Sequence, residues 1–463
     1  RAGTAAFAVL RERWPGVRRI SVLCGMGNNG GDGYVVARLA QQAGLEATVI
    51  QVGDGSKLKG DAYRAAEAMR ACGLVPQPFA HSHLGSADVL VDALLGTGLD
   101  RAVSGEFRAA IEAINASRLP VLAIDIPSGL YADSGRVLGA AVEAQATVSF
   151  IGLKQGMFTG EGPDHCGAIY FADLAVPAEV YTAASPSARR LDLSHLSRLL
   201  PPRRRTAHKG HFGHVLVVGG DHGYAGAARM AAEAAARVGA GLISLATRAS
   251  HAGSVALTRP EIMCHGIEDP KALTPLLNKA TVIALGPGLS QSSWARRLFA
   301  RVLEQVKPLV IDADGLNLLA TDPVAKGTWI LTPHPGEAAR LLGTTSAAVQ
   351  ADRFQAAAEI QKRYDGVCVL KGAGTVIAGP DGSLSVCQGG NPGMASGGMG
   401  DVLTGVIAGL LAQGLSLADA ACLGVCLHAH AGDLAAGQDE RGLLASDLMP
   451  WLRKLANPSP CPR

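Results

Sequence analysis

The sequence predicts an α/β protein with two parallel-sheet domains, and three observations support this prediction. Short apolar segments such as "RISVLCGMG" and "ADVLVDALLG" alternate with amphipathic segments such as "GDGYVVARLAQQAG". This alternation is typical of parallel strands joined by helices. The chain of 463 residues is too long for one ordinary core. Its 58 glycines and abundant alanines are typical of tight turns and closely packed helices.

The composition excludes several function classes. Apolar residues make up 48% and charged residues 17% of the chain, which is typical of folded protein. A net charge of only +3 provides no basic field, so we expect no nucleic acid and no membrane as partner. Apolar runs stay below the roughly 18 residues that a bilayer span needs. The nine cysteines, an odd number without a CxxC pair, indicate reduced thiols in a cytoplasmic protein.

The strand-like and helix-like segments form two series along the chain. The first series predicts a domain over residues 1–185, and the second predicts a domain over residues 190–458. Between them, residues 177–207 are rich in Pro, Ser and Arg, which is typical of a domain junction. The chain begins at Arg1 within a helix-like segment. We therefore expect a truncated chain whose missing start leaves room for a targeting segment.

The turn after the first predicted strand, in "CGMGNNGGDGYVVARLA", is rich in glycine. Read as GxGxxG, it indicates a dinucleotide-binding, Rossmann-like domain, and Asn29 and Asp32 add oxygen atoms to the turn. Asp92 and Asp125 each end a later predicted strand, where open parallel sheets bind their ligands. The alternative for either aspartate is an N-cap of the following helix.

The extended motif "GMGNNGGDG", together with "DALLGTGLDR" and "AIDIPSGL", resembles the NAD(P)H-hydrate epimerase family over about residues 1–180. The resemblance implies that Asp125 is the acid/base that interconverts the R and S epimers at C6 of hydrated NADH and NADPH (NADHX and NADPHX). It also implies a bound K⁺ held by Asn29, Asp92 and Ser128, and oxygen ligands suit such a hard cation. The implied substrate site consists of Asn28, Asn29, Gly30, Gly31, Asp32, Gly96, Thr97, Gly98, Leu99, Asp100, Arg101, Ala102 and Asp125.

Members of that family use an N-terminal helical segment to build a dimer, and the segment is absent from this sequence. We expect a homo-oligomer, with the contribution of that segment to it left open.

A second glycine-rich stretch, "GNPGMASGGMGDVLTG", spans Gly390 to Gly405 and precedes a helix-like segment. Backbone N–H groups at the start of a helix attract anions and can stabilise the charge on a transferred phosphoryl group. Asp401 at the end of the loop can then accept the proton of an attacking hydroxyl group as a general base. Mg²⁺ and the helix dipole would offset its repulsion from phosphate. The alternative is an ordinary turn before a helix.

The motif "GMGD" at residues 398–401, in a chain without a Walker A motif, resembles the ribokinase-like superfamily. With "TPHPGEAARLLG" and "LKGAGTVIA", residues 200–455 resemble ADP-dependent NAD(P)H-hydrate dehydratases. The resemblance implies ADP as phosphoryl donor and Mg²⁺, for which Asp312 and Asp314 are candidate ligands or ordinary strand-end acids. It places the hydrated dinucleotide at Ala227, Gly288, His334 and Asp401, although His334 could instead shape a turn. The implied nucleotide site consists of Lys371, Gly372, Ala373, Gly374, Thr375 and Gly400.

The two resemblances together imply a bifunctional metabolite-repair enzyme. Phosphorylation of the C6 hydroxyl group would turn a poor leaving group into a good one, and elimination of phosphate would restore NADH or NADPH. Two alternatives are a ribokinase-like kinase for a small vitamin-type alcohol and a non-catalytic adaptor with a Rossmann-like module. The kinase would release a stable phosphorylated product. An adaptor has no need of the set Asn29, Asp92 and Asp125.

Four further groups of residues carry weaker patterns. The histidines at every third position of "HKGHFGH" are more typical of a flexible loop than of a metal site. The run of three arginines is more typical of a solvated linker than of a phosphate contact. The two cysteines one helical turn apart are typical of a buried core. The two histidines that follow the cysteines lack a convincing ligand spacing. These groups are His208, His211 and His214; Arg203, Arg204 and Arg205; Cys422 and Cys426; and His428 and His430.

Overall fold

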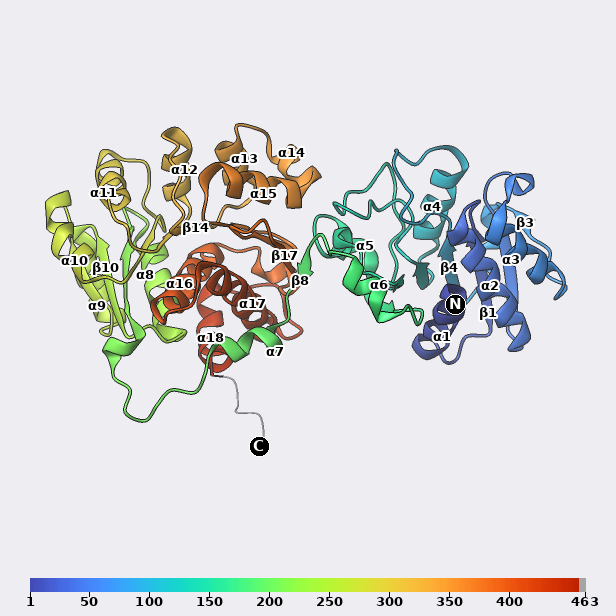
Figure 1. The fold of residues 1–463 in the computed structure, drawn as a ribbon, viewed down its shortest axis with the longest axis horizontal. Helices are drawn as coiled ribbons and strands as arrows, with labels where there is room; N and C mark the ends of the chain where they lie inside the picture. The colour runs from blue at the N-terminus through green and yellow to red at the C-terminus, as the bar shows by residue number, and fades with distance from the viewer. Residues whose placement is uncertain (458–463) are drawn as a thin grey trace. The chain divides into compact units, whose positions relative to one another are not determined.

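The structure, a computed structural model, describes residues 1–457 and divides into two compact units, Arg1–Pro186 and one that begins at Ser187 (Figure 1). The predicted end of the second domain, residue 458, lies outside the described residues. Each unit is built on its own sheet, and most strand pairs in both sheets are parallel. The predicted α/β class with two parallel-sheet domains is therefore confirmed.

The first unit has a seven-stranded sheet in the order β3-β2-β1-β4-β5-β6-β7, and all its strand pairs are parallel. The chain runs outward from β1 to β3 and then returns to the other side of β1 as β4. Ligands bind at such a switch point, at the carboxyl ends of the strands. The strands are β1 (Arg19–Cys24), β2 (Glu46–Gln51), β3 (Gln77–Pro78), β4 (Val89–Ala93), β5 (Val121–Ile124), β6 (Ala146–Phe150) and β7 (Ala168–Ala172).

Glycines allow the helix after β1 to pack closely on this sheet. A Cβ atom at Gly30 would lie 2.1 Å from the Gly25 carbonyl oxygen, and one at Gly33 would lie 2.8 Å from Cys24 Sγ. No side chain fits at either position, so the glycine motif sets how the helix begins. The helices of the unit are α1 (Ala2–Arg13), α2 (Asn28–Gln42), α3 (Gly60–Arg70), α4 (Gly105–Ser117), α5 (Gly162–Cys166) and α6 (Ala178–Ala183).

The second unit has a ten-stranded sheet in the order β11-β10-β9-β12-β13-β14-β15-β16-β17-β8. Strands β9 to β15 are parallel, whereas β16 is antiparallel to both of its neighbours. The strands are β8 (Arg189–Arg190), β9 (His214–Val218), β10 (Leu242–Thr247), β11 (Met263–Gly266), β12 (Val282–Leu285), β13 (Leu309–Ile311), β14 (Trp329–Leu331), β15 (Val367–Leu370), β16 (Thr375–Ala378) and β17 (Leu384–Cys387).

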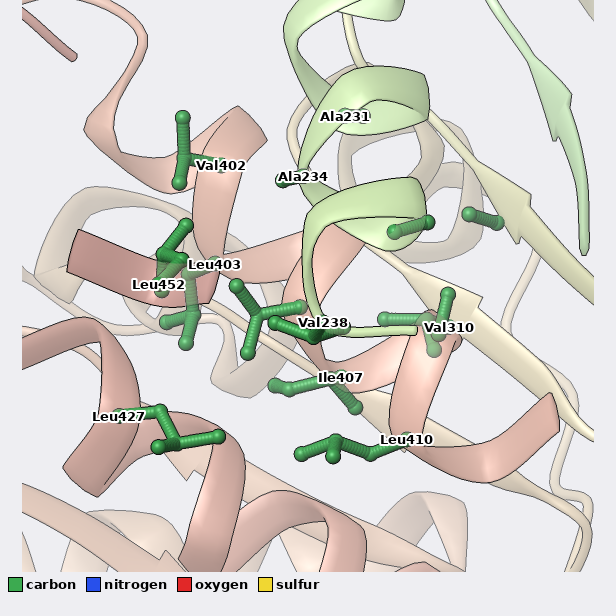
Figure 2. Packing of buried hydrophobic residues seen from close by; sticks show 14 of the residues in the cluster. Ala231, Ala234, Val238, Val310, Val402, Leu403, Ile407, Leu410, Leu427 and Leu452 are labelled. Carbon is green, nitrogen blue, oxygen red and sulfur yellow. The ribbon is translucent and has the colours of Figure 1, made fainter. Parts of the chain in front are cut away.

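A buried helix, α16 (Met399–Ala412), forms the centre of the core of this unit. Helix α8 (Ala225–Arg237) packs against it so closely that a Cβ atom at Gly405 would lie 2.0 Å from the Ala231 carbonyl oxygen. Figure 2 shows Val238, at the end of α8, next to Ile407 of α16, with Val310 of β13 to their side. The core therefore holds the glycine-rich start of α16 firmly against the sheet.

The remaining helices of the second unit surround this core. They are α7 (Leu193–Leu196), α9 (Ala249–Thr258), α10 (Thr274–Lys279), α11 (Ser293–Leu303), α12 (Asp314–Thr321), α13 (Pro335–Leu342), α14 (Ser346–Ala351), α15 (Arg353–Tyr364), α17 (Leu417–Ala436) and α18 (Leu448–Leu455). Within residues 1–457, none of the helices combines the length and the apolar character that crossing a bilayer requires.

Candidate active sites

In the first unit, a cavity of about 950 Å³ lies at the carboxyl ends of β1, β4 and β5. Its lining includes Asn28, Asn29, Asp32, residues 96–102 and Asp125 from the predicted set. Gly30 and Gly31 do not line it: both are buried where α2 packs on its neighbours, and a Cβ atom at Gly31 would lie 3.0 Å from Ala62 Cα. The structure thus brings most of the predicted epimerase residues around one space.

The three predicted K⁺ ligands lie together beneath the loop that follows β4. Asp92 is fully buried and accepts hydrogen bonds from the Ser128 hydroxyl (2.6 Å) and from the Ser128 backbone N–H (2.8 Å). Ser128 Oγ also lies 3.1 Å from the Leu95 carbonyl oxygen, which accepts a 3.0 Å hydrogen bond from Asn29 Nδ2. Burial raises the pKa of Asp92 to about 6, and its hydrogen bonds oppose the rise. This buried, oxygen-rich set fits a hard cation.

Asp125 forms an ion pair that the sequence did not indicate. Its backbone has a left-handed φ of +68°, which is costly for a residue with a side chain, and its N–H donates to the Val148 carbonyl (2.8 Å). Its Oδ1 accepts a hydrogen bond from Lys154 Nζ, in the loop after β6. The only signal in the sequence was a lysine shortly after an apolar strand, in "FIGLKQG".

Asp32, the fifth residue of α2, faces the same cavity. Burial raises its pKa to about 6, and the charge of Asp125 adds to this rise. Two of the carboxyl groups that line the cavity are therefore in different environments: Asp125 is paired with a lysine, and Asp32 is shifted toward its neutral form. This is the kind of arrangement that supports acid/base chemistry.

In the second unit, four charged side chains meet where strands end and α16 begins. Asp312 follows β13, Glu337 is in the first turn of α13, Lys371 follows β15, and Asp401 is in the first turn of α16. Lys371 Nζ lies 2.5 Å from Asp312 Oδ1 and 3.8 Å from Glu337 Oε2. The other Asp312 oxygen accepts a 2.8 Å hydrogen bond from Thr404.

Three carboxylates around one lysine shift one another's protonation. Burial raises the pKa of Asp401 to about 7; Asp312 and Glu337 add to the rise and Lys371 opposes it. The pKa of Glu337 rises to about 7, chiefly through burial. Burial acts to lower the pKa of Lys371, but the three carboxylates outweigh it and the pKa lies above its ordinary value. The site is therefore rich in negative charge and poised to exchange a proton near neutral pH.

Two glycine-rich turns frame this cluster. A Cβ atom at Gly400 would lie 3.2 Å from Lys371 Nζ, so a side chain there would crowd the ammonium group. The turn from Lys371 to Thr375 joins β15 to β16, and its Gly372 has a φ of +136°. Buried Arg353 supports this turn by donating to the Lys371 carbonyl (3.1 Å). Sequence analysis did not identify Arg353 or Glu337, because each acts through a contact between distant segments.

Ala227 and Gly288 are brought together, since a Cβ atom at Gly288 would lie 3.1 Å from Ala227 Cβ. Asp221, which follows β9, contacts the same region: its backbone N–H donates a hydrogen bond to the Gly288 carbonyl oxygen (2.7 Å). Its carboxylate accepts from Ser292 Oγ (2.6 Å) and pairs with Arg248 (2.7 Å). Although burial opposes them, these hydrogen bonds hold the pKa of Asp221 well below its usual range. Asp221 is a further residue that sequence analysis did not single out.

His334 has a structural role in this structure. Its Nδ1 accepts a hydrogen bond from the Gly336 N–H (2.9 Å) at the start of α13, while its Nε2 lies 3.4 Å from Glu337 Oε1. Burial lowers its pKa, and Lys371 lowers it further. The predicted turn-shaping alternative therefore describes what His334 does, and its half-exposed side chain stays open to a ligand.

Both carboxylate oxygens of Asp314, at the start of α12, accept hydrogen bonds from protein groups. Its Oδ2 accepts a 2.8 Å hydrogen bond from the Ser290 N–H, and its Oδ1 accepts one of 3.1 Å from Asn317. Asp312, in contrast, faces the charged cluster. Of the two candidate Mg²⁺ ligands, Asp312 alone is in contact with Lys371.

The weaker sequence patterns have structural explanations. His208 and His211 stack with ring centroids 3.7 Å apart, whereas His214 is buried in β9 and hydrogen-bonds with Ser244 Oγ (2.8 Å). Over residues 1–457, no group of three or more His, Cys, Asp or Glu side chains is arranged to hold a metal ion. Cys422 and Cys426 belong to the core of the second unit or pack on it, and the eight cysteines of the described part are free thiols.

The arginine run, residues 203–205, is exposed, whereas His428 is buried and His430 is partly buried. Arg203 stacks on Phe212 at 3.6 Å and lines a cavity of about 690 Å³ at the carboxyl-terminal ends of α8 and α16. Asp401 lies at the other end of α16. Arg204 and Arg205 are exposed. His428 is buried, with a pKa lowered to about 4 chiefly by burial, and His430 Nδ1 hydrogen-bonds with the Cys426 carbonyl (2.8 Å).

Comparison with known proteins finds a matching family for each unit. A family model described as NAD(P)H-hydrate dehydratase matches residues 215–454, and one described as YjeF-related protein N-terminus matches residues 1–156. The bifunctional NAD(P)H-hydrate repair enzyme of Coxiella burnetii is 52% identical over 459 residues, which cover 99% of this chain and 94% of that protein.

Two solved structures resemble the second unit. One is a ribokinase-like superfamily protein from Enterococcus faecalis, with a TM-score of 0.56 and 30% identity over 59% of this chain and 97% of that chain. The other is an ADP/ATP-dependent NAD(P)H-hydrate dehydratase from Bacillus subtilis, co-crystallised with ATP and Mg²⁺, with a TM-score of 0.52 and 29% identity over 58% of this chain and 98% of that chain. The predicted ribokinase-like fold is thereby confirmed.

The relatives decide between the interpretations that the sequence left open. A vitamin kinase joined to a binding module, or an adaptor, is not favoured, because both halves of the chain match the corresponding halves of one enzyme. With its two units, two charged sites and full-length relatives, the chain belongs to the family of bifunctional NAD(P)H-hydrate repair enzymes.

Proposed function

We propose that the first unit interconverts the R and S epimers of NADHX and NADPHX at C6, and that the second unit converts the S epimer to NADH or NADPH. The phosphoryl donor is ADP, and the second step ends with release of inorganic phosphate. The two activities complement each other, because one consumes a single epimer and the other resupplies it. A cytoplasmic location and assembly as a homo-oligomer belong to the same proposal, and the free thiols are consistent with a reducing compartment.

The single observation that carries the dehydratase proposal is the position of Asp401. It lies in the first turn of α16, directly after a glycine-rich loop, and the positive charge of Lys371 acts on its carboxyl group. Its carboxylate accepts the proton of the C6 hydroxyl group as that oxygen forms a bond to the phosphorus of ADP and AMP leaves. The C6–O bond then breaks, phosphate leaves with the electron pair, and loss of the C5 proton forms the ring double bond.

Other groups of the second unit hold the reactants. The backbone of Gly372, Ala373, Gly374 and Thr375 binds the nucleotide, with Lys371 and Gly400 at the transferred phosphate. Ala227, Gly288 and His334 contact the hydrated dinucleotide. The excess of carboxylates over lysine fits a divalent cation, so Asp312 and Glu337 would hold Mg²⁺ near the phosphates. When bound, Mg²⁺ neutralises charge on the phosphoryl group.

In the first unit, Asp125 moves the proton of the C6 hydroxyl group. As this proton leaves, the oxygen forms a carbonyl with C6, and the C6–N1 bond breaks with its electron pair passing to N1. Attack of N1 on the opposite face of the aldehyde then re-forms the bond and inverts C6, and the oxygen takes the proton back from Asp125. Asn28, Asn29, Asp32 and residues 96–102 bind the dinucleotide. Asn29, Asp92 and Ser128 would hold K⁺, whose fit rests on the buried Asp92 carboxylate among oxygen atoms. When bound, K⁺ supplies positive charge beneath the substrate loop.

The direct test is to incubate the purified chain with racemic NADHX and either ADP or ATP, and to follow the absorbance band of reduced nicotinamide. We expect conversion of both epimers and one inorganic phosphate per NADH formed. A stable phosphorylated product would indicate a kinase instead. Failure to form NADH with either nucleotide would overturn the proposal.

A further inference from the structure

Lys154 occupies an unusual position in the cavity of the first unit. It lines this cavity beside Asp125, yet its side chain is only 15% exposed. Its ammonium group donates to Asp125 Oδ1, to Ser149 Oγ (3.0 Å) and to the Phe150 carbonyl oxygen (3.2 Å). An ammonium group has three hydrogens, so protein atoms accept all of them.

These contacts join two neighbouring strands. Asp125 follows β5, whereas Ser149 and Phe150 end β6, which pairs with β5 in parallel. The Asp125 N–H donates to Val148 on β6, so its backbone and its side chain are both tied to that strand. The positive φ of Asp125 persists because its surroundings hold it in place from both sides.

We propose that Lys154 is a positioning residue for the epimerase reaction, holding Asp125 Oδ1 so that Oδ2 faces the substrate. This inference rests on the proposed function of the first unit, in which Asp125 moves the proton. The second oxygen points toward the loop after β4: a Cβ atom at Gly96 would lie 3.7 Å from Asp125 Oδ2. Residues of this loop line the cavity from Gly96 to Ser104.

The geometry favours a positioning role for Lys154 over a role as proton donor. To donate to substrate, the ammonium group would have to give up one of three protein hydrogen bonds in a confined site. Serving Asp125 instead, it selects one rotamer of that carboxylate, because its other two hydrogen bonds fix the ammonium group on β6. A base held in one orientation avoids the loss that misplacement causes.

Several charged groups surround this pair. Asp32 from α2 and Asp100 and Arg101 from the loop after β4 line the cavity. Without Lys154, Asp125 would lose its direct cation, and its Oδ1 would lose the partner that fixes its position.

The test uses the full chain with the variants Lys154→Met and Lys154→Arg, and Lys57→Met as control. Lys57 belongs to the same unit, lies outside the cavity and is 76% exposed. Epimerisation of the R epimer is followed by chromatography over a range of substrate concentrations, which gives kcat and KM separately. Dehydration of the S epimer by the same chain reports on the second unit.

For Lys154→Met we expect kcat to fall by about 10- to 100-fold, with KM within about twofold of the wild type. Lys154→Arg, which keeps a cation beside Asp125, recovers part of kcat, and Lys57→Met changes neither kcat nor KM.

Wild-type kcat in Lys154→Met, or a KM that rises as much as kcat falls, or a loss of kcat in Lys154→Arg as large as in Lys154→Met, overturns the inference alone. A wild-type chain that does not epimerise overturns the proposed function instead. If Lys154→Met does not fold, Ser149→Ala decides the matter, since it removes only one acceptor of the ammonium group. We then expect kcat to fall by a few fold, roughly 2- to 5-fold, with KM unchanged. An unchanged kcat in Ser149→Ala contradicts the inference.

Discussion

Lys371 Nζ lies 2.5 Å from Asp312 Oδ1, and Asp312 Oδ2 accepts a 2.8 Å hydrogen bond from Thr404 of the helix that carries Asp401. The ion pair therefore connects the ends of β13 and β15 to the start of α16. Because all three segments meet at these two side chains, the nucleotide turn and the proposed base are held in one rigid arrangement. The predictions that follow depend on this arrangement and on its counterpart in the first unit.

Replacing Asp401 with Asn should abolish nucleotide-dependent dehydration. Loss of a general base costs about 10²- to 10⁴-fold in rate. Release of inorganic phosphate from S-NADHX and ADP measures the effect, and epimerisation by the same protein is the control. Dehydration at the wild-type rate would remove Asp401 from its role as base.

The same variant should be more stable than the wild type near neutral pH. The pKa of Asp401 is raised from 3.8 to about 7, so the folded state keeps a proton that the unfolded state has lost. Stability from this group is present at low pH and is lost as pH rises through about 4 to 7. The Asp401→Asn variant has no such loss, and its advantage should grow across this range to about 1–3 kcal/mol and then level off.

Urea unfolding at several pH values, monitored for the second unit, checks this expectation. Asp381→Asn is the control, because that exposed carboxyl group has a pKa held below its usual range by Ser383. An advantage of Asp401→Asn that shrinks as pH rises would contradict the raised pKa.

Replacing Asp125 with Asn should leave half of a racemic hydrate unrepaired. The second unit consumes the S epimer, so formation of NADH should stop near the midpoint. Chromatography of the remaining hydrate should find only the R epimer. Spontaneous epimerisation is measured separately without protein. A progress curve that runs to completion at a rate above this background would exclude Asp125 from the mechanism.

The second unit should work alone when it is cut before β8. Arg189 and Arg190 form that strand and pair with Ser385 and Val386 of β17. A chain starting at Ser187 keeps the strand, whereas one starting at residue 190 cuts it. We expect the former to dehydrate the S epimer with nearly unchanged kcat. A folded but inactive fragment would show that the first unit or an oligomer completes the site.

Replacing Gly405 with Ala should destabilise the second unit by about 1–3 kcal/mol through overpacking. The new Cβ atom would lie 2.0 Å from the Ala231 carbonyl oxygen, and the buried helices leave little room to move. Gly253→Ala in α9 is the matched control, with no atom within 4 Å, and should stabilise by up to about 1 kcal/mol. Denaturant unfolding measures both, and equal stabilities would contradict the packing argument.

Local sequence patterns were sufficient to predict the α/β class and the elements that carry the proposed sites. Strands in parallel sheets are buried on both faces and appear as apolar runs, and the ends of such runs are where ligand sites are expected, as at Asp92 in β4 and Asp125 after β5. The glycine motif after β1 was also visible in the sequence, but only some of its residues line the cavity. Gly30 and Gly31 provide room for helix packing and do not line the cavity.

Tertiary structure alone decided which charges meet. Lys154 reaches Asp125 because β5 and β6 are neighbours, and Glu337 and Asp312 reach Lys371 because three strand ends lie side by side. Nothing in a single segment specifies such contacts, since they join residues 29 to 59 positions apart. The sequence by itself determined the elements and the candidate aspartates. The folded sheets determined which charged partners lie close enough to interact with these aspartates, because electrostatic coupling depends on distance in space.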